Sequence, residues 1–329
     1  MSISSNKEIY RNLCKTEETI QIFIQDWWLD AVCGADNWNV LLSYTKDGSV
    51  KGSLCFYVKE KMGLKYITQP KFSQNTGLWL NYPKDLSHEK RLSFEKETCF
   101  DLIKQLEEYT KANRIVFYQQ AFDTRYTNWL PFYWKGYQQT TAYTYRIENI
   151  SDIEIVYNNF NYSKKKNIKK ANKLFKITYD LPSETFYEHH KTSLEKQHDK
   201  INYSFELFSR MYNAAYKHNQ GKVICCKDQE NNIHVALFVI WDKIAAYDLI
   251  STIDPDFRNS GASSLAIFEI IKYLKDTVHT FDFEGSMIEG IENSFRKFGT
   301  IQTPYLRINK IMTDNKLIKC ILGKKINGR

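Results

Sequence analysis

The chain has 329 residues and a formal net charge of +8, and hydrophobic residues make up 43% of it. This length and apolar content predict two folded domains and exclude a disordered or collagen-like chain. The cysteines are scattered and never spaced C-x-x-C, which argues against a disulfide framework and against a zinc site. The longest purely apolar stretch, residues 235–241, is too short to cross a bilayer, so we expect a cytoplasmic protein without a membrane span.

The first half of the sequence predicts a hairpin and a third strand, followed by a long helix, a strand, a short helical piece and a closing strand. An Asp-Gly pair at residues 47–48 marks the turn of the hairpin. The predicted elements cover residues 39–45, 50–58, 64–68, 86–112, 114–120, 123–136 and 140–147.

The second half predicts a lysine-rich helix and two amphipathic segments, and then the same order of elements as the first half. The predicted elements cover residues 163–176, 184–195, 204–218, 222–228, 234–241, 244–252, 263–275, 279–285, 291–299 and 305–308. Single residues match as well, because Gly136 and Gly299 each end a helix and Arg146 and Arg307 each precede an isoleucine. We therefore expect a duplicated α/β unit with mixed sheets, divided into residues 1–150 and 151–329.

The lysine-rich helix that opens the second half contains seven lysines within residues 163–176. Lys166, Lys169, Lys170 and Lys173 share one helical face. Such a face can hold the phosphates of a nucleotide or an RNA, and the alternative is a solvated helix surface.

A loop of small residues, Arg258 to Ser263, connects a predicted strand to a predicted helix. Unpaired backbone N–H groups at a helix start bind phosphate or carboxylate, so we expect this loop to face a cleft. The alternative is that Ser263 or Ser264 only caps the helix.

The strand 279–285 contains two carboxylates, Asp282 and Glu284, which its period of two places on one side. One could act as a general base or hold a substrate amine, and the alternative is a structural ion pair. The following helix contains Phe295 and Arg296, so all four side chains could face one groove. The histidines lack the spacing of a helical metal site, and we expect no metal.

The element order and the Arg258-x-x-Gly261-x-Ser263 loop resemble the GNAT acyltransferase superfamily. Two such units, with SKKKNIKKANK opening the second and FDFEGS and SFRKFG closing it, resemble more narrowly the FemAB-type family, which includes the FemX-type aminoacyl transferases of peptidoglycan bridge synthesis. The resemblance spans almost the whole chain. It implies an α/β fold (α+β mixed sheet) of two tandem GNAT-like domains related by internal duplication.

The resemblance also implies N-acyl transfer, in which an amine of a cell-envelope precursor or nucleotide-activated sugar attacks an acyl ester or thioester. Acyl-CoA or aminoacyl-tRNA would be the co-substrate, with no covalently bound cofactor, no DNA partner, and tRNA as partner in the second case. The alternatives are an acyl-CoA-dependent acetyltransferase acting on another small amine, and a non-catalytic ligand- or RNA-binding protein that keeps the fold.

The site residues that follow from the resemblance and the motifs fall into three groups. The catalytic candidates are Asp282, Glu284, Phe295 and Arg296, where Phe295-Arg296 matches a Phe-Lys pair of the family. The donor-binding candidates are Arg258, Ser260, Gly261, Ala262 and Ser263. The acceptor-binding candidates are Trp28 and Lys196.

Overall fold

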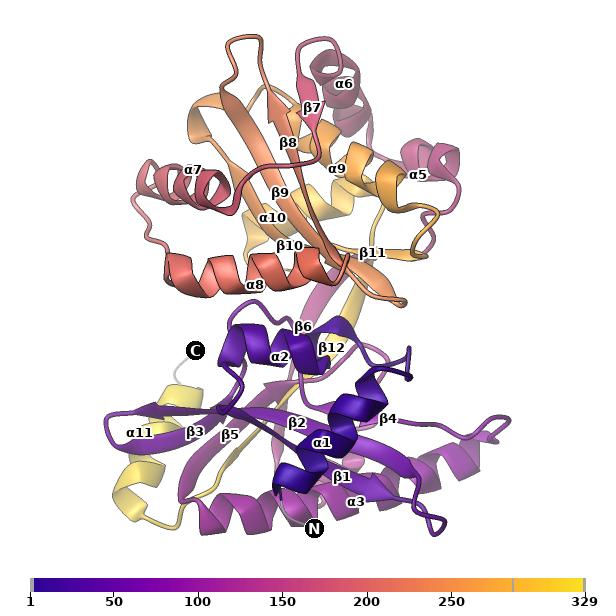
Figure 1. Ribbon diagram of the computed structural model, residues 1–329, viewed down its shortest axis with the longest axis vertical. Coiled ribbons are helices and arrows are strands. Elements are labelled where there is room, and N and C mark those ends of the chain that lie inside the picture. The colour runs from indigo at the N-terminus through magenta and orange to yellow at the C-terminus, as the bar shows by residue number, and fades with distance from the viewer. Residues whose placement is uncertain (1–2, 286, 328–329) are drawn as a thin grey trace. The chain divides into compact units, whose positions relative to one another are not determined.

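The computed structural model describes residues 3–285 and 287–327 and divides into two compact units (Figure 1). Unit 1 comprises Met1–Ala142 and Pro304–Arg329, and unit 2 comprises Tyr143–Thr303. None of the helices in the described part combines the length with the apolar character that a membrane span requires.

Unit 1 is a mixed sheet with helices on both faces. Its strands are ordered β1-β2-β3-β5-β12, with β4 also paired to β2. Only β3 and β5 run parallel among the pairs described in this unit. The elements are α1 (Ile3–Cys14), η1 (Ile22–Ile24), α2 (Asp26–Cys33), β1 (Trp38–Tyr44), β2 (Val50–Lys61), β3 (Leu64–Thr68), β4 (Leu78–Leu80), α3 (His88–Ala112), β5 (Ile115–Ala121), α4 (Leu130–Tyr133), the first part of β6 (Gln138–Ile147), the last part of β12 (Ile301–Ile311) and α11 (Lys316–Asn327).

The core of unit 1 follows from the alternation of side chains along β1. Leu41 packs in one apolar cluster with Leu102 and Leu106 of α3. On the other face of the strand, the ring of Trp38 lies 6.3 Å from that of Tyr10 in α1. Because neighbouring residues of a strand point to opposite faces, β1 is covered by a helix on each side.

Unit 2 contains the remaining strands of the twelve-stranded sheet to which the strands of unit 1 also belong, in the order β6-β11-β10-β9-β8-β7. Here β10 and β11 run parallel. The elements are the last part of β6, α5 (Ile153–Asn159), α6 (Tyr162–Ala171), β7 (Lys176–Thr178), α7 (Ser183–Glu195), α8 (Phe205–Lys217), β8 (Gly221–Lys227), β9 (Ile233–Trp241), β10 (Ala245–Ile253), η2 (Pro255–Phe257), α9 (Ala262–Leu274), β11 (Thr280–Asp282), α10 (Glu289–Phe295), η3 (Arg296–Phe298) and the first part of β12.

The uninterrupted apolar run at residues 235–241 lies in strand β9, which is buried on both faces. Val235, Leu237 and Val239 belong to the cluster that contains the buried face of α9. Phe238 points the other way, and its ring lies 6.4 Å from that of Phe208 in α8. Since helices cover both faces of the sheet here, every position of the strand interior is apolar.

The last strand of each half-sequence pairs within the unit formed mainly by the other half. Strand β6 pairs antiparallel with β11 of unit 2, with Arg146 opposite Asp282. Strand β12 pairs antiparallel with β5 of unit 1, with Arg307 opposite Ala121. The compact units therefore differ from a linear division of the chain, because residues 304–329 belong to unit 1. The proposed repeat boundaries, 1–150 and 151–329, stay a prediction about the sequence.

The structure confirms the repeated order of hairpin, third strand, helix, strand, helix and strand, and corrects two elements. The lysine-rich helix ends at Ala171, and Lys176–Thr178 forms β7, which pairs with β8. Strand β11 ends at Asp282, because Glu284 has a left-handed φ of 56° that no regular strand accommodates. The short or terminal elements α1, α2, β4, α5 and α11 were not predicted.

Gly136 and Gly299 provide a matched test of the two helix ends, since both have a left-handed φ (74° and 69°). A Cβ at Gly299 would lie 2.7 Å from the carbonyl oxygen of Asn159, whereas one at Gly136 would meet nothing within 4 Å. Alanine at either position costs about 1–2 kcal/mol for the left-handed backbone. We expect Gly299→Ala to lower the free energy of unfolding by at least a further ~1 kcal/mol in denaturant titrations. Equal losses for the two variants would contradict this packing.

Candidate functional site

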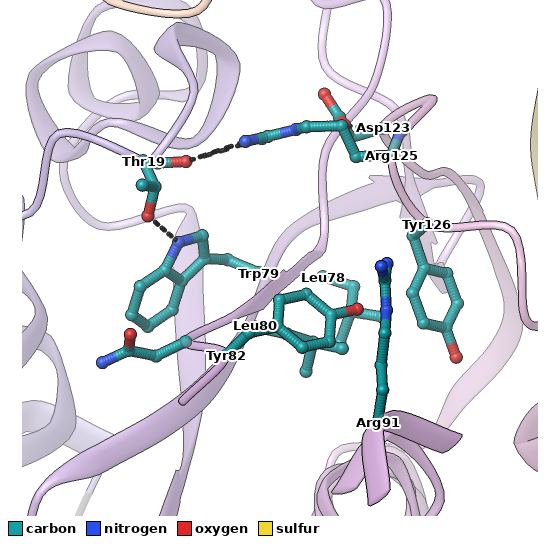
Figure 2. Close-up of a pocket in the computed structure, with 10 residues that line it drawn as sticks. Thr19, Leu78, Trp79, Leu80, Tyr82, Arg91, Asp123, Arg125 and Tyr126 are labelled. Atoms are coloured by element: carbon teal, nitrogen blue, oxygen red, sulfur yellow. Dashed lines mark hydrogen bonds and ion pairs between the residues drawn. The ribbon is translucent and has the colours of Figure 1, made fainter. Parts of the chain in front are cut away.

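Unit 1 contains a cavity of about 410 Å³ (Figure 2). Two leucines of β4 and a tryptophan between them supply apolar surface, and two arginines and two tyrosines supply polar groups. The lining residues are Thr19, Leu78, Trp79, Leu80, Asn81, Tyr82, Arg91, Asp123, Arg125 and Tyr126. Sequence reasoning missed this cavity, because its residues come from four separate segments.

The two acceptor-binding candidates are both engaged within the protein. Trp28 is 0% exposed and its indole Nε1 donates to Ser73 Oγ at 3.0 Å, so the ring is a core residue of unit 1. In unit 2, the Lys196 ammonium lies 2.8 Å from a carboxylate oxygen of Asp254 and 2.6 Å from one of Asp256. Hydrogen bonds to Asp254 and Asp256 raise the pKa of Lys196. Neither residue leaves a free group for an acceptor in this arrangement, and their roles stay predictions.

The parallel strands β10 and β11 of unit 2 are paired over a short length only. Residues Ala245–Tyr247 pair with Thr280–Asp282, after which the described chain of β11 leaves the sheet while β10 continues to Ile253. A bulge between Asp248 and Ile250 interrupts the pairing of β10 with β9 at the same level. Beyond Tyr247, β10 therefore has an edge of backbone N–H and C=O groups that can bind a ligand.

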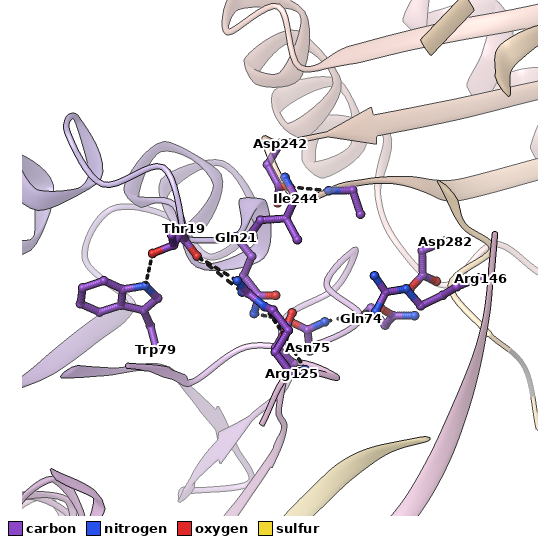
Figure 3. Close-up of polar contacts among 12 residues, drawn as sticks. Thr19, Gln21, Gln74, Asn75, Trp79, Arg125, Arg146, Asp242, Ile244 and Asp282 are labelled. Atoms are coloured by element: carbon purple, nitrogen blue, oxygen red, sulfur yellow. Dashed lines mark hydrogen bonds and ion pairs between the residues drawn. The ribbon is translucent and has the colours of Figure 1, made fainter. Parts of the chain in front are cut away.

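Asp282 anchors the end of β11. Its carboxylate accepts hydrogen bonds from Thr144 Oγ1 and, at 2.7 Å, from the backbone N–H of Glu284. Arg146 Nε lies 3.8 Å from the other carboxylate oxygen, and Figure 3 shows the two side chains. Asp282 is 2% exposed, so these donors compensate the cost of burying it. Arg146, which the sequence marked only as a repeated residue, is thus part of the site.

Glu284 lies two residues after Asp282, and its carboxyl group is not held by hydrogen bonds in the same way. Its Oε1 is buried and has no hydrogen-bond partner among the described residues. Burial, reinforced by the charges of Asp282 and Asp248, raises the pKa of Glu284 well above its ordinary value. The two carboxylates predicted to share a side are close together, but through the turn after the strand and not through the period of two.

Asp248 is a site residue that sequence reasoning missed. It lies at the bulge of β10, it is 6% exposed, and its Oδ2 accepts from Ser251 Oγ at 2.7 Å. Its Oδ1 has no partner among the described residues. Burial raises the pKa of Asp248 to about 6. Asp248 and Glu284 thus each present an unpaired, buried carboxyl oxygen near the divergence of β10 and β11, where a proton or an ammonium group would be stabilised.

The two aromatic and cationic catalytic candidates are placed by α10 and η3. The ring of Phe295 lies 5.1 Å from that of Phe283, which stands between the two carboxylates in the chain. Arg296 is exposed and contacts its own helical turn, with Nη2 donating to Asn293 Oδ1 at 3.1 Å and Nε 3.8 Å from Glu292. The ring contact with Phe283 therefore places Phe295 against the residue that lies between Asp282 and Glu284 in the chain. Within the described chain, the contacts of Arg296 are with Asn293 and Glu292 and not with the other three catalytic candidates.

The loop Arg258–Ser263, which is the candidate for donor binding, has a packing role that the sequence did not reveal. Gly261, with a φ of 89°, begins α9, and a Cβ there would lie 2.8 Å from the carbonyl oxygen of Asn167 in α6. Ser260 Oγ accepts from the backbone N–H of Ala262 at 3.2 Å, and Arg258 Nη2 donates to Gln197 at 2.6 Å. Close contact with α6 already requires a glycine here. Whether Arg258, Ser260, Gly261, Ala262 and Ser263 bind a donor stays a prediction.

The lysine-rich helix α6 contains one lysine that differs from the others. Lys164 is buried, its Nζ donates to Ser294 Oγ at 3.0 Å, and it lies 4.0 Å from the centroid of the Phe298 ring. Burial, with a smaller effect of nearby Lys297, lowers the pKa of Lys164 to about 8. Charge runs in a sequence do not distinguish such a lysine from its solvated neighbours. Lys166, Lys169, Lys170 and Lys173 are exposed.

Replacing Asp248 tests the buried carboxyl group. A folded-state pKa of about 6, against an ordinary 3.8, means that the native state binds the proton more tightly, so stability is lost as the pH rises from about 4 to 7. Asp248→Asn mimics the protonated acid. Relative to the parent, we expect the variant to gain on the order of 3 kcal/mol in free energy of unfolding between pH 4 and pH 8. The exposed Asp276→Asn should show no such gain, and parallel curves for Asp248→Asn and the parent would contradict the assignment.

No protein-family model matches the chain, and comparison with curated proteins gave no match. Solved structures match along almost the whole chain. FemX superposes with a TM-score of 0.71 and 12% identity, covering 96% of this chain and 98% of its own. L-PGS from Bacillus licheniformis gives a TM-score of 0.57 at 9% identity, covering 99% of this chain and 97% of its own.

A tandem GNAT protein from the clavulanic acid biosynthesis pathway also matches, with a TM-score of 0.53 and 7% identity over 95% of this chain and 96% of its own. At such identities the likeness shows the fold. The chain thus has the fold of a tandem GNAT protein, with parallel and antiparallel strand pairs in each of two α/β units, as the sequence predicted.

Proposed function

We propose that the chain is an N-acyltransferase, in which the divergence of β10 and β11 receives the acyl group and Glu284 receives the proton of the acceptor amine. The buried, unpaired carboxyl oxygen of Glu284 beside the free edge of β10 is the observation that carries the proposal. The GNAT-like fold and the FemAB-type resemblance of the sequence support it.

In this reaction the amine nitrogen attacks the acyl carbon, so that a C–N bond forms and the C–S or C–O bond to the donor breaks. The oxyanion formed at the acyl carbon needs a fixed donor, and backbone N–H groups on the free edge of β10 are of the right kind. The attacking nitrogen loses one proton to the Glu284 carboxylate, and the Glu284 carboxyl group then passes that proton to the leaving thiolate or alkoxide. Burial raises the pKa of Glu284 well above its ordinary value, which makes this carboxylate a stronger proton acceptor than an exposed one.

Two donors remain, and each is supported by one feature of unit 2. Aminoacyl-tRNA is supported by the exposed lysines of and after α6, for which no ion pair is found in the described residues. Acyl-CoA is supported by the loop Arg258–Ser263 at the start of α9, a helix long enough to have an appreciable dipole. The acceptor would be an amine of a cell-envelope precursor or nucleotide-activated sugar, an expectation that rests on the FemX likeness.

The role of Glu284 is tested by Glu284→Gln, with the exposed Glu289→Gln as control. With a panel of amines, and with acetyl-CoA and charged tRNA as alternative donors, we expect kcat to fall about 100-fold for Glu284→Gln while the donor KM is unchanged. The parent's rate should also fall below the raised pKa of Glu284, where the carboxylate is protonated. Normal turnover by a folded Glu284→Gln protein would leave catalysis to positioning alone.

The donor is tested by replacing Lys166, Lys169 and Lys170 together with glutamine. If aminoacyl-tRNA is the donor, the variant should bind tRNA more weakly. The slope of log K against log salt concentration should also become shallower by about 0.7–0.9 for each lost phosphate contact. The control replaces Lys59, Lys61 and Lys65, which are exposed on unit 1. Unchanged tRNA affinity in the first variant would show that these lysines form only a solvated surface.

A further inference from the structure

The cavity of unit 1 is not used by the acyl transfer proposed above, yet its lining combines apolar surface with fixed charges. We propose that it binds a small organic mono-carboxylate, whose anionic group pairs with Arg91 and whose apolar body lies on Leu78, Leu80 and Trp79 (Figure 2). Its volume of about 410 Å³ falls within the range of about 300–1,000 Å³ that is typical of small-molecule sites.

Arg91 is held in place before any ligand arrives. Glu95 of α3 is 3% exposed, and its Oε1 accepts from Arg91 Nε at 3.1 Å and from the Tyr82 hydroxyl at 2.8 Å. Its Oε2 accepts from Asn128 Nδ2 at 2.8 Å. The guanidinium carbon of Arg91 also lies 4.6 Å from the centroid of the Tyr82 ring. A side chain fixed in this way loses little entropy when it binds an anion.

The orientation of Arg91 suits a planar, two-oxygen anion. Because Nε faces Glu95, the two terminal nitrogens form the other end of the guanidinium, and Arg91 is one of the residues that line the cavity (Figure 2). A carboxylate matches such a pair of nitrogens with two parallel N–H···O bonds.

The charges around the cavity favour a mono-anion over a phosphate. Arg125 Nε donates to Asp123 Oδ1 at 2.6 Å, so this arginine has its own counter-ion. Glu95 and Asp123 together balance Arg91 and Arg125. A carboxylate adds one negative charge to this neutral group, whereas a phosphate monoester adds nearly two, so a carboxylate leaves less charge without a counter-ion.

Apolar side chains of β4 also line the cavity and suit a ligand with an apolar body. Trp79 Nε1 donates to Thr19 Oγ1 at 3.0 Å, which fixes the indole and uses up its polar group. Leu78 and Leu80 flank it and are 4% and 9% exposed. An indole and two leucine side chains attract an aromatic or branched aliphatic group.

Calorimetric titration of the full chain with phenylacetate, phenylacetamide and phenyl phosphate tests the proposal. We expect phenylacetate to bind at least about 10-fold more tightly than the uncharged amide and than the phosphate. Arg91→Gln should weaken phenylacetate binding at least about 10-fold. The affinity of Arg91→Lys for phenylacetate should lie between those of the parent and of Arg91→Gln. The control is Arg114→Gln, which removes the same charge from an exposed position of unit 1 and should bind as the parent does.

A second variant guards against a folding defect in Arg91→Gln. Asn81 is exposed and lines the cavity, so Asn81→Trp places a large ring in the cavity and leaves the Arg91–Glu95 pair intact. This variant should also lose phenylacetate binding while its melting temperature stays that of the parent. No binding of phenylacetate to the parent, equal binding of the amide or the phosphate, or parent-like binding by either variant would each overturn the proposal.

Discussion

The pairing of each half-sequence's last strand with the other unit's sheet is the constraint on which this structure depends. Strand β6 gives β11 an antiparallel neighbour, and Arg146 and Thr144 from that strand hold Asp282. Asp282 in turn fixes the turn that places Glu284. The carboxylates of unit 2 are therefore positioned by side chains from the first half of the sequence. The candidate site belongs to neither half alone.

The sequence predicted the elements well, because the period of side chains and the turn residues are local signals. Gly136 and Gly299, two of the glycines with a positive φ, were located as matching helix ends from the repeat. The partners with which β6 and β12 pair were not predictable, because the alternation of side chains along a strand is the same whichever strand lies beside it. The end of the lysine-rich helix at Ala171 was missed for a similar reason, because lysines occur in helices and in edge strands alike.

The site was predictable only in part. Asp282 and Glu284 were found because they are charged residues in an apolar strand, although a left-handed residue and not strand geometry brings them together. Asp248 gave no signal, since a bulge is a property of two paired strands. Gly261 gave a signal that has two explanations, because a small residue at a helix start can make room for a ligand or for a neighbouring helix. In the structure, the backbone of Asn167 in α6 lies against it. The roles of Asp248 and Gly261 thus depend on contacts between residues that are far apart in the sequence.

The exchanged strands also set the order of events during synthesis of the protein. Strand β5 has β3 and β12 as its neighbours, and β12 is synthesised only after residues 122–300, which separate the two strands in the chain. Until then, the side of β5 that β12 will cover is an open strand edge in a chain whose first half is otherwise ready to fold. Such edges recruit foreign strands, and pairing across so long a separation is slow. The nascent chain thus carries an unpaired strand edge from the synthesis of β5 until that of β12, which makes this edge a natural target for a chaperone.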